Sequence, residues 1–257
     1  MQCVEYMSDK LHTLENSLHE IVRGYPFPVH WQVRDLATRQ TVGEGEHEVL
    51  GAFSTRKVSV LLACLTLVKS GKLALDDTYV IDDELKDGVQ AGIMRHLSSG
   101  IELSLRDHLA QMMITSDNIC TQIVFRAIGE VTGDALQWVN DYCVQVGMRD
   151  SLHREIFPRS AELEWSHSIE SMTVTSAHDQ ALILEWLARG SCHQEDAAFL
   201  GLTTQLCDIA IKLLSNLLTP MLGASLDWGH FAEKNGRGIR GLSQVGLLLD
   251  AADQPVA

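Results

Sequence analysis

The sequence predicts an α+β protein with two lobes. Residues 29–50 and 230–249 show the short apolar alternation that is typical of strands, whereas the roughly 170 residues between them favour helices. Strands contributed by both ends of a chain predict one antiparallel sheet with a helical lobe inserted into it. We therefore expect a sheet lobe at 1–52 and 224–257, an all-helical lobe at 53–223, and an active site where the two lobes meet.

A helix and a hairpin are the first predicted elements. Residues 8–23 place apolar side chains at helical spacing behind a Ser8 cap, which predicts an amphipathic helix that flanks the sheet. Residues 29–35 alternate in polarity, and residues 41–50 follow after a turn-like Ala-Thr-Arg-Gln stretch. This pattern indicates two antiparallel strands.

Helical patterns dominate the middle of the chain. The most apolar helix begins at Ser54 and ends at Ser70, where Gly71 is a natural C-cap. Residues 149–172 contain Pro158 and little periodicity, which predicts a long loop. The remaining predicted helices span residues 104–114, 118–128, 134–146, 175–188 and 203–218, and the last two strands span residues 230–234 and 242–249.

Composition limits the function classes. The chain has 257 residues, 46% of them apolar, so it can bury a core without metal or disulfide support. Its net charge of -14 disfavours nucleic acid and anionic membranes and leaves a small-molecule substrate as the expected partner. The six cysteines are scattered without a CxxC pair and the histidines form no HExxH motif, so we expect reduced thiols, no metal and no other cofactor.

The ends of the sequence give two further expectations. Acidic residues interrupt the first 20 residues, which excludes a signal-peptide pattern, and no stretch reaches the ~18 apolar residues of a membrane span. We therefore expect a cytoplasmic protein. A sheet that closes on the strand at 242–249 would leave an exposed edge. We expect a missing C-terminal strand and helix, or a homo-oligomer, to cover that edge.

Ser54 and Lys57 are the first candidates for chemistry. Residues three apart lie on one face of a helix, so the hydroxyl and the amine can lie close together. A lysine in a partly desolvated site can be neutral and accept the serine proton, which makes the serine a nucleophile. A helix N-terminus with a capping serine and a solvated lysine would show the same spacing.

Two further segments carry polar groups that suit the same chemistry. Ser116-Asp117-Asn118 lies at a helix junction, and Lys234-Asn235-Gly236 lies on a late strand. The serine of the first segment could relay a proton to a leaving group. The lysine of the second adds positive charge that binds a substrate carboxylate and lowers the pKa of a neighbouring lysine. Taken singly, the first segment is also typical of a helix N-cap and the second of a strand-end turn.

In this order and approximate spacing, the three segments resemble the active-site motifs of class A β-lactamases and penicillin-binding D,D-peptidases. Residues 92–97 and 232–241 are also similar to that superfamily, and the resemblance extends from the first hairpin to the last strand. It implies a serine hydrolase in which Ser54 is the nucleophile, Lys57 the base and Ser116 the proton relay. It further implies an oxyanion hole and substrate contacts supplied by the N–H groups of Ser54 and Arg237 and by Asn118, Lys234, Asn235 and Gly236.

The chain departs from the family pattern at two places. Asn235 stands where the family prefers Thr or Ser; its amide is larger and has no rotatable hydroxyl, so substrates without a carboxylate become more plausible. Residues 149–172 lack the E-x-x-L-N motif whose glutamate activates the hydrolytic water. Counting back from residues 172–174 places Pro158 or a neighbour at that position, and counting forward from residues 152–154 places Glu155 or Ile156 there. Glu155 is the candidate base for deacylation, and a solvated loop carboxylate is the alternative.

These features lead to two functional hypotheses. The first is a serine hydrolase that acts on an amide, ester or lactone through an acyl-Ser54 intermediate, with β-lactam hydrolysis less favoured because no clear deacylating glutamate is present. The second is a D,D-peptidase-like or ligand-sensing domain that acylates without efficient turnover. A catalytically idle scaffold is a third reading, which the three motifs disfavour.

Overall fold

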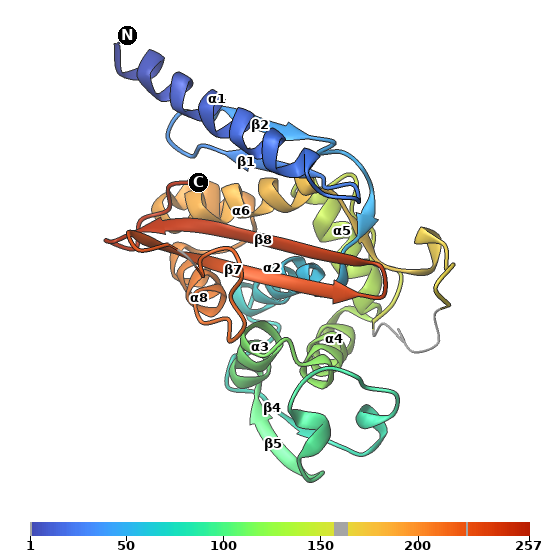
Figure 1. The fold of residues 1–257 in the computed structure, drawn as a ribbon. Helices are drawn as coiled ribbons and strands as arrows, with labels where there is room; N and C mark the ends of the chain where they lie inside the picture. The colour runs from blue at the N-terminus through green and yellow to red at the C-terminus, as the bar shows by residue number, and fades with distance from the viewer. Residues whose placement is uncertain (1, 157–163, 225) are drawn as a thin grey trace.

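The computed structural model describes residues 2–156, 164–224 and 226–257. Part of the predicted loop at 149–172, including Pro158, lies outside these residues. The fold is a mixture of helices and small antiparallel sheets, which confirms the predicted α+β class. Figure 1 shows the N-terminal helix and hairpin at the top, the C-terminal hairpin across the middle, and most of the helices behind and below that hairpin.

Both ends of the chain contribute antiparallel pairs, as predicted. Near the N-terminus, β1 (Trp31–Arg34) pairs with β2 (Thr41–Glu44), and α1 (Gln2–Arg23) lies along them. Near the C-terminus, β7 (Gly229–Gly238) and β8 (Gly241–Asp250) form a long hairpin (Figure 1). Each hairpin is a separate two-stranded sheet in the described part of the chain.

Seven helices and several short elements lie between these hairpins in the described residues. The helices are α2 (Lys57–Lys69), α3 (Leu105–Ile114), α4 (Asn118–Thr132), α5 (Ala135–Gln145), α6 (Ala177–Cys192), α7 (Gln194–Phe199) and α8 (Thr204–Leu214). Short 3-10 turns are η1 (Phe53–Arg56), η2 (Glu84–Lys86), η3 (Met94–His96) and η5 (Ile169–Ser171). The short strands pair as β3 (Leu50–Gly51) with β6 (Val174–Thr175) and β4 (Thr78–Ile81) with β5 (Ile101–Ser104).

Side-chain caps explain where most of these helices begin. A Ser, Thr or Asp immediately before the first helical residue accepts a hydrogen bond from a backbone N–H of the first turn, which would otherwise have no partner. Such caps precede α3, α4, α5, α6 and α8, and they are Ser104, Asp117, Asp134, Ser176 and Thr203.

The structure differs from the sequence-based expectations in four details. The two terminal hairpins are separate two-stranded sheets in the described residues, whereas one sheet built from both chain ends was expected. The inserted region is not all helical, because β4 and β5 form a hairpin within it. The apolar helix expected from Ser54 begins with the 3-10 turn η1, and its α-helical part starts at Lys57. Finally, α6 continues past Gly190, where a helix end was expected, because the missing side chain lets this helix pack closely on Ala197 and Cys207.

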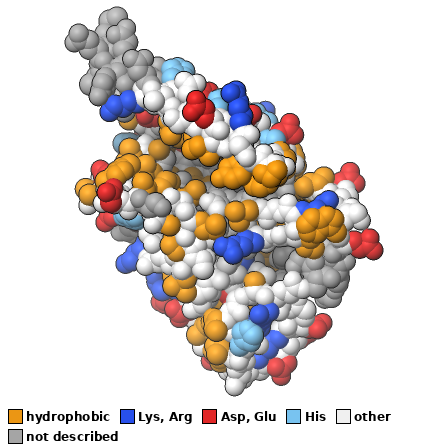
Figure 2. Space-filling view, in the orientation of Figure 1, with side chains coloured by type: hydrophobic (Ala, Val, Ile, Leu, Met, Phe, Trp, Pro, Cys, Tyr) orange, Lys and Arg blue, Asp and Glu red, His pale blue; other side chains and the backbone are white. Residues whose placement is uncertain are grey.

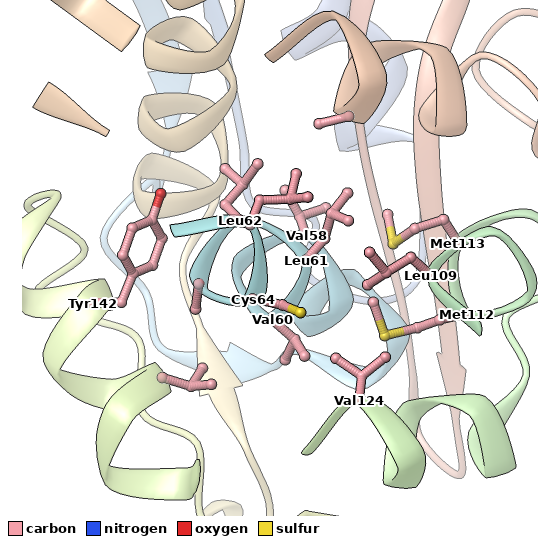
Figure 3. Packing of buried hydrophobic residues seen from close by; sticks show 14 of the residues in the cluster. Val58, Val60, Leu61, Leu62, Cys64, Leu109, Met112, Met113, Val124 and Tyr142 are labelled. Atoms are coloured by element: carbon pink, nitrogen blue, oxygen red, sulfur yellow. The ribbon is translucent and has the colours of Figure 1, made fainter. Parts of the chain in front are cut away.

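The core is built around α2. This helix is apolar on all sides and almost completely buried, as expected for a helix surrounded by other elements. Figure 3 shows its side chains in contact with Leu109 and Met112 of α3, Val124 of α4 and Tyr142 of α5. Because α2 follows directly after η1, this packing fixes the position of Ser54.

The surface carries an apolar face. Figure 2 shows hydrophobic side chains gathered over the two terminal hairpins in the orientation of Figure 1. Exposed members of this class include Phe27, Leu242 and Val256. No helix among the described residues is long and apolar enough to cross a membrane.

We expect Leu61→Ala to lower the free energy of unfolding by about 2–5 kcal/mol, because Leu61 is fully buried in α2 and its truncation leaves a cavity. Urea denaturation followed by circular dichroism measures this change. Leu218→Ala is the matched control: Leu218 is 68% exposed, so its truncation should cost less than about 1 kcal/mol. Equal losses in the two variants would contradict the location of the core.

Candidate active site

Ser54 lies in η1, between β3 and α2. The preceding residue, Phe53, has a positive φ of 47°, which is rare for a bulky residue and turns the chain from the strand into the helix. The ring of Phe53 packs on two glycines of the β7–β8 hairpin. A side chain at Gly238 or Gly241 would place its Cβ 1.8 or 2.8 Å from that ring, so only glycine allows this contact.

The backbone of β7 passes directly beside Ser54. A Cβ added at Gly236 would lie 2.5 Å from the backbone nitrogen of Ser54, so the absence of a side chain permits this approach. Arg237 follows Gly236 on the same strand. This position of β7 is compatible with an oxyanion hole formed by the N–H groups of Ser54 and Arg237. The oxyanion hole itself stays a prediction.

Lys57 connects the nucleophile segment to the junction of α3 and α4. Its Nζ donates hydrogen bonds to the carbonyl oxygen of Ser116 at 2.7 Å and to Asn118 Oδ1 at 2.8 Å, and it lies 3.2 Å from Ser116 Oγ. The structure thus brings together Lys57 and the first and third residues of the Ser116-Asp117-Asn118 segment. This contact makes a proton path between Lys57 and Ser116 possible.

The conformation of the α3–α4 junction presents Ser116 to the lysine. Ser116 has a positive φ of 59°, and the next residue, Asp117, caps α4 by accepting from the N–H groups of Ile119 and Cys120. The second carboxylate oxygen of Asp117 accepts from the N–H of Met94 at 2.9 Å. Asp117 is therefore a structural residue that holds the turn in which Ser116 lies.

The two predicted lysines are buried and have lowered pKa values. Burial is the main cause that takes the pKa of Lys57 well below its ordinary range, and the charges of Lys234 and Arg56 lower it further. Burial also lowers the pKa of Lys234 to about 8, and Glu233 partly opposes this change. A lowered pKa favours the neutral amine, which is the state a general base needs.

Three predicted substrate contacts have other partners in the structure. Lys234 is fully buried and its Nζ donates to the carbonyl oxygen of Asn235 at 2.9 Å, so it does not present a free ammonium to solvent. The side-chain amide of Asn235 donates to the carbonyl oxygen of Thr219 at 2.6 Å. The exposed guanidinium of Arg237 contacts the sulfur of Met221. A role for these side chains in binding a substrate carboxylate stays a prediction.

Glu155 lies beside Arg56. Its Oε1 accepts from Arg56 Nη1 at 2.8 Å and from the N–H of Thr173 at 3.2 Å, and it is not among the partners of Lys57. The structure therefore does not bring Glu155 to the lysine, and its proposed role in deacylation stays a prediction without support from these contacts.

Sequence reasoning missed three residues that hold the site together. Arg56 is buried in the structure. It lies between Ser54 and Lys57 in the sequence, and that position was the available signal. Ser243, which faces Gly236 in the hairpin, contacts the hydroxyl of Thr55 at 3.0 Å and connects β8 to η1. Glu233 accepts hydrogen bonds from the backbone N–H groups of Met221 and Leu222, and no sequence pattern indicated this partner.

Two cavities of the structure lie elsewhere. One, of ≈440 Å³, is lined by α4 and α5 residues together with Leu85 and Ile156, and the other, of ≈400 Å³, includes His47, His178 and Asp150. None of the predicted site residues lines either cavity. The candidate site is therefore identified by the contacts of its side chains, and neither of these two cavities marks it.

We expect Gly236→Ala to slow covalent labelling of Ser54 by a fluorophosphonate probe by at least about 100-fold, because the added methyl group pushes β7 away from the Ser54 N–H. Gly129→Ala is the matched control, since a Cβ there meets no atom closer than 3.6 Å. Unchanged labelling of the Gly236 variant would show that this close approach is not needed.

We expect Lys234→Met to raise the free energy of unfolding at pH 7. A pKa lowered from 10.5 to about 8 corresponds to about 3 kcal/mol of destabilisation by the buried ammonium, which methionine of similar size avoids. The cost is fully present below pH 8 and declines as the pH rises toward 10.5, because the unfolded chain then binds more protons. Urea titrations from pH 7 to 10 measure it, with the exposed Lys212→Met as control.

Comparison with known proteins agrees with this geometry. Residues 13–257 match the model of the Beta-lactamase enzyme family, whereas no curated protein matches the chain significantly. Among solved structures, the chain is similar to that of PBP-A, with a TM-score of 0.75 and 16% identity over 96% of this chain and 89% of the other. It is also similar to a chromosome-encoded β-lactamase of Vibrio parahaemolyticus, with a TM-score of 0.75 and 19% identity over 95% and 87% of the two chains.

A β-lactamase from Sphaerobacter thermophilus DSM 20745 gives a TM-score of 0.72 and 21% identity over 87% of this chain and 78% of the other. At such identities these likenesses show a shared fold and carry no information on substrate. The family model, by contrast, covers nearly the whole chain and includes every predicted site residue. The resemblance inferred from the motifs is thereby confirmed, and the chain belongs to the β-lactamase enzyme family.

Proposed function

We propose that this β-lactamase-like hydrolase acts through an acyl-Ser54 intermediate on an amide, ester or lactone bond. The observation that supports the proposal most directly is the environment of Lys57. This lysine is 2% exposed, is held by Ser116 and Asn118, and has a pKa that burial lowers well below its ordinary range. A neutral amine three residues after a serine is suited to deprotonate that serine.

The proposed acylation uses groups of four residues. Ser54 Oγ attacks the carbonyl carbon of the substrate while the neutral amine of Lys57 takes the hydroxyl proton. The negative charge on the carbonyl oxygen is stabilised by the N–H groups of Ser54 and Arg237. As the tetrahedral intermediate collapses, the bond to the leaving group breaks, and Ser116, in contact with the protonated Lys57, passes a proton to that group.

Release of the acyl group completes the proposed cycle. Water, or another nucleophile that carries a proton, attacks the acyl-Ser54 ester, and the bond to Ser54 Oγ breaks. In the proposed step, Lys57, neutral again after the leaving group has taken its proton, accepts a proton from the attacking nucleophile and returns it to Ser54 Oγ. In hydrolysis the products are a carboxylic acid and the leaving group of the first step.

Asn235 favours substrates without an essential carboxylate. Its amide nitrogen already donates to the carbonyl oxygen and, at 3.3 Å, to the hydroxyl of Thr219. Because Lys234 is also fully buried, neither side chain is free to bind a carboxylate in this conformation. A neutral amide, ester or lactone therefore suits the site better than an anionic substrate.

A second candidate function is acylation without efficient turnover, as in a penicillin-binding or ligand-sensing domain. The observation that favours it is the ion pair of Glu155 with Arg56. The carboxylate of Glu155, which the sequence suggested as the base for water, is bound to the guanidinium instead. An acyl-enzyme that lacks a base for its water would persist.

We expect wild-type protein to gain the mass of one acyl group on Ser54 when it meets reactive members of a panel of β-lactams, esters and lactones. Intact-protein mass spectrometry with peptide mapping measures the adduct, and Ser54→Ala should abolish both the adduct and any turnover because it removes the nucleophile. Ser70→Ala, at the exposed far end of α2, is the matched control.

The time course separates the two candidate functions. An adduct that decays while product accumulates supports the hydrolase, and one equivalent of product followed by a stable adduct supports the acylating sensor. Labelling that persists in Ser54→Ala would overturn both, as would a lack of any Ser54 adduct across the panel.

A further inference from the structure

Residues 219–223 follow α8 and precede β7, and we call this segment the strap. Just before the strap, Leu218 donates its backbone N–H to the carbonyl oxygen of Ile114 at 3.0 Å, at the end of α3 and two residues before Ser116. The strap itself is bound to β7, the strand whose Gly236 approaches the backbone of the nucleophile. It therefore connects the two sides of the candidate site, the α3–α4 junction and β7.

Alternate residues of β7 hold the strap. The carboxylate of Glu233 accepts from the backbone N–H of Met221 at 3.0 Å, and the amide of Asn235 donates to the carbonyl oxygen of Thr219 at 2.6 Å. The guanidinium of Arg237 lies 3.6 Å from the sulfur of Met221. Residues two apart share one face of a strand, so these contacts follow one face of β7. The strap is thus attached to the residues on both sides of the glycine that approaches the nucleophile.

Glu233 is arranged to anchor the strap. It is 1% exposed, and each of its carboxylate oxygens binds backbone N–H groups of the strap. Oε1 accepts from Met221 at 3.0 Å and Gly223 at 3.5 Å, and Oε2 accepts from Met221 and Leu222, both at 3.1 Å. A buried carboxylate is costly unless hydrogen bonds satisfy it, and here the backbone of the strap supplies them. Loss of the carboxylate should therefore release the strap.

The strap occupies the side-chain donors of Asn235. The amide nitrogen has two hydrogens, and Thr219 offers an acceptor for each, its carbonyl oxygen at 2.6 Å and its hydroxyl at 3.3 Å. A substrate carboxylate is an acceptor for the same N–H groups and forms the stronger, charge-assisted hydrogen bond. Such a carboxylate can bind this amide only if the strap moves away.

We propose that the strap sets the substrate selectivity of this site: it occupies the Asn235 amide, so that the site acylates neutral substrates in preference to anionic ones. Asn235 is then the specificity-determining residue, and Glu233 is a positioning residue that acts through the strap. Met221 and Leu222, which are 36% and 38% exposed, add an apolar surface that suits a neutral group. The inference rests on the proposed function, in which Ser54 is acylated.

The test uses two probes that differ in one charge. 4-Nitrophenyl hydrogen glutarate carries a carboxylate, and its methyl ester is neutral. Acylation of Ser54 Oγ breaks the bond to 4-nitrophenolate, whose absorbance gives the rate constant, while mass spectrometry verifies the adduct. Wild type should prefer the neutral probe by about 10-fold. Glu233→Gln turns an NH₂ group toward N–H groups of the strap, so it should release the strap and lower this preference by about 10-fold.

Hydrogen exchange measures release of the strap without a substrate. The amides of residues 221–223 should exchange about 10-fold faster in Glu233→Gln than in wild type. Lys234 cannot explain a gain of the anionic probe, because Glu233 partly opposes the lowered pKa of Lys234 and its loss makes that lysine less positive. Glu185→Gln is the matched control: this carboxylate pairs with Arg34 at 2.7 Å, and its loss should change neither readout.

Two further variants separate selectivity from loosening alone. Glu233→Gln/Asn235→Ala also releases the strap but lacks the amide, so its probe preference should return to within about threefold of the wild-type value. Gly223→Ala loosens the strap without a change in charge, because its Cβ would lie 3.2 Å from the backbone nitrogen of Phe231 in β7. It should lower the preference in the same direction as Glu233→Gln and replaces that variant if the latter does not fold.

Faster exchange with an unchanged probe preference would overturn the inference, as would unchanged exchange in both Glu233→Gln and Gly223→Ala. A lowered preference that persists in Glu233→Gln/Asn235→Ala would overturn the role of Asn235. Failure of the proposed function is recognised separately, because neither probe would then form a Ser54 adduct in any variant, whereas hydrogen exchange would still report the release of the strap.

Discussion

Burial of positive charge at the meeting of η1, α2 and β7 is the constraint on which the site depends. Lys57 and Lys234 are both almost inaccessible to solvent, and neither makes an ion pair with a carboxylate at hydrogen-bond distance in the described part of the chain. A buried ammonium without a counter-charge loses stability unless it becomes neutral. The fold accepts this cost at the position where a neutral amine is useful, which is typical of functional sites.

Two of the four non-glycine residues with positive φ in the described part of the chain lie at the same place. Phe53 and Ser116 both have positive φ values, and each is held by contacts that the rest of the fold provides. The ring of Phe53 packs on glycines of the hairpin, while the turn at Ser116 is fixed by the cap of α4 and by the contact with Lys57. Strained residues persist only where surrounding structure over-determines them. The apolar packing of α2 and the β7–β8 hairpin supplies that support.

The sequence predicted the helices and the terminal hairpins well because their periodicity is local. The motifs also predicted the family, which the family model confirms. Among the candidate site residues, the structure places the side chains of Lys57 and Ser116 in contact, and their roles stay predictions. It could not predict the β4–β5 hairpin, whose strands have only four residues each and little alternation. Nor could it predict the pairing of Arg56 with Glu155, 99 residues away, because long-range ion pairs leave no spacing signal.

The acidic residues around the site explain how an acidic protein can maintain a basic centre. The chain has a net charge of -14, yet the carboxylates nearest the lysines are used within the structure. Asp117 accepts from backbone N–H groups at a helix start, Glu233 accepts from those of the segment before β7, and Glu155 pairs with Arg56. Each carboxylate is thereby partly neutralised by donors that cannot lose a proton at neutral pH. Burial is the main cause that lowers the pKa of Lys57, and the positive charges of Lys234 and Arg56 add to it despite the negative net charge of the chain.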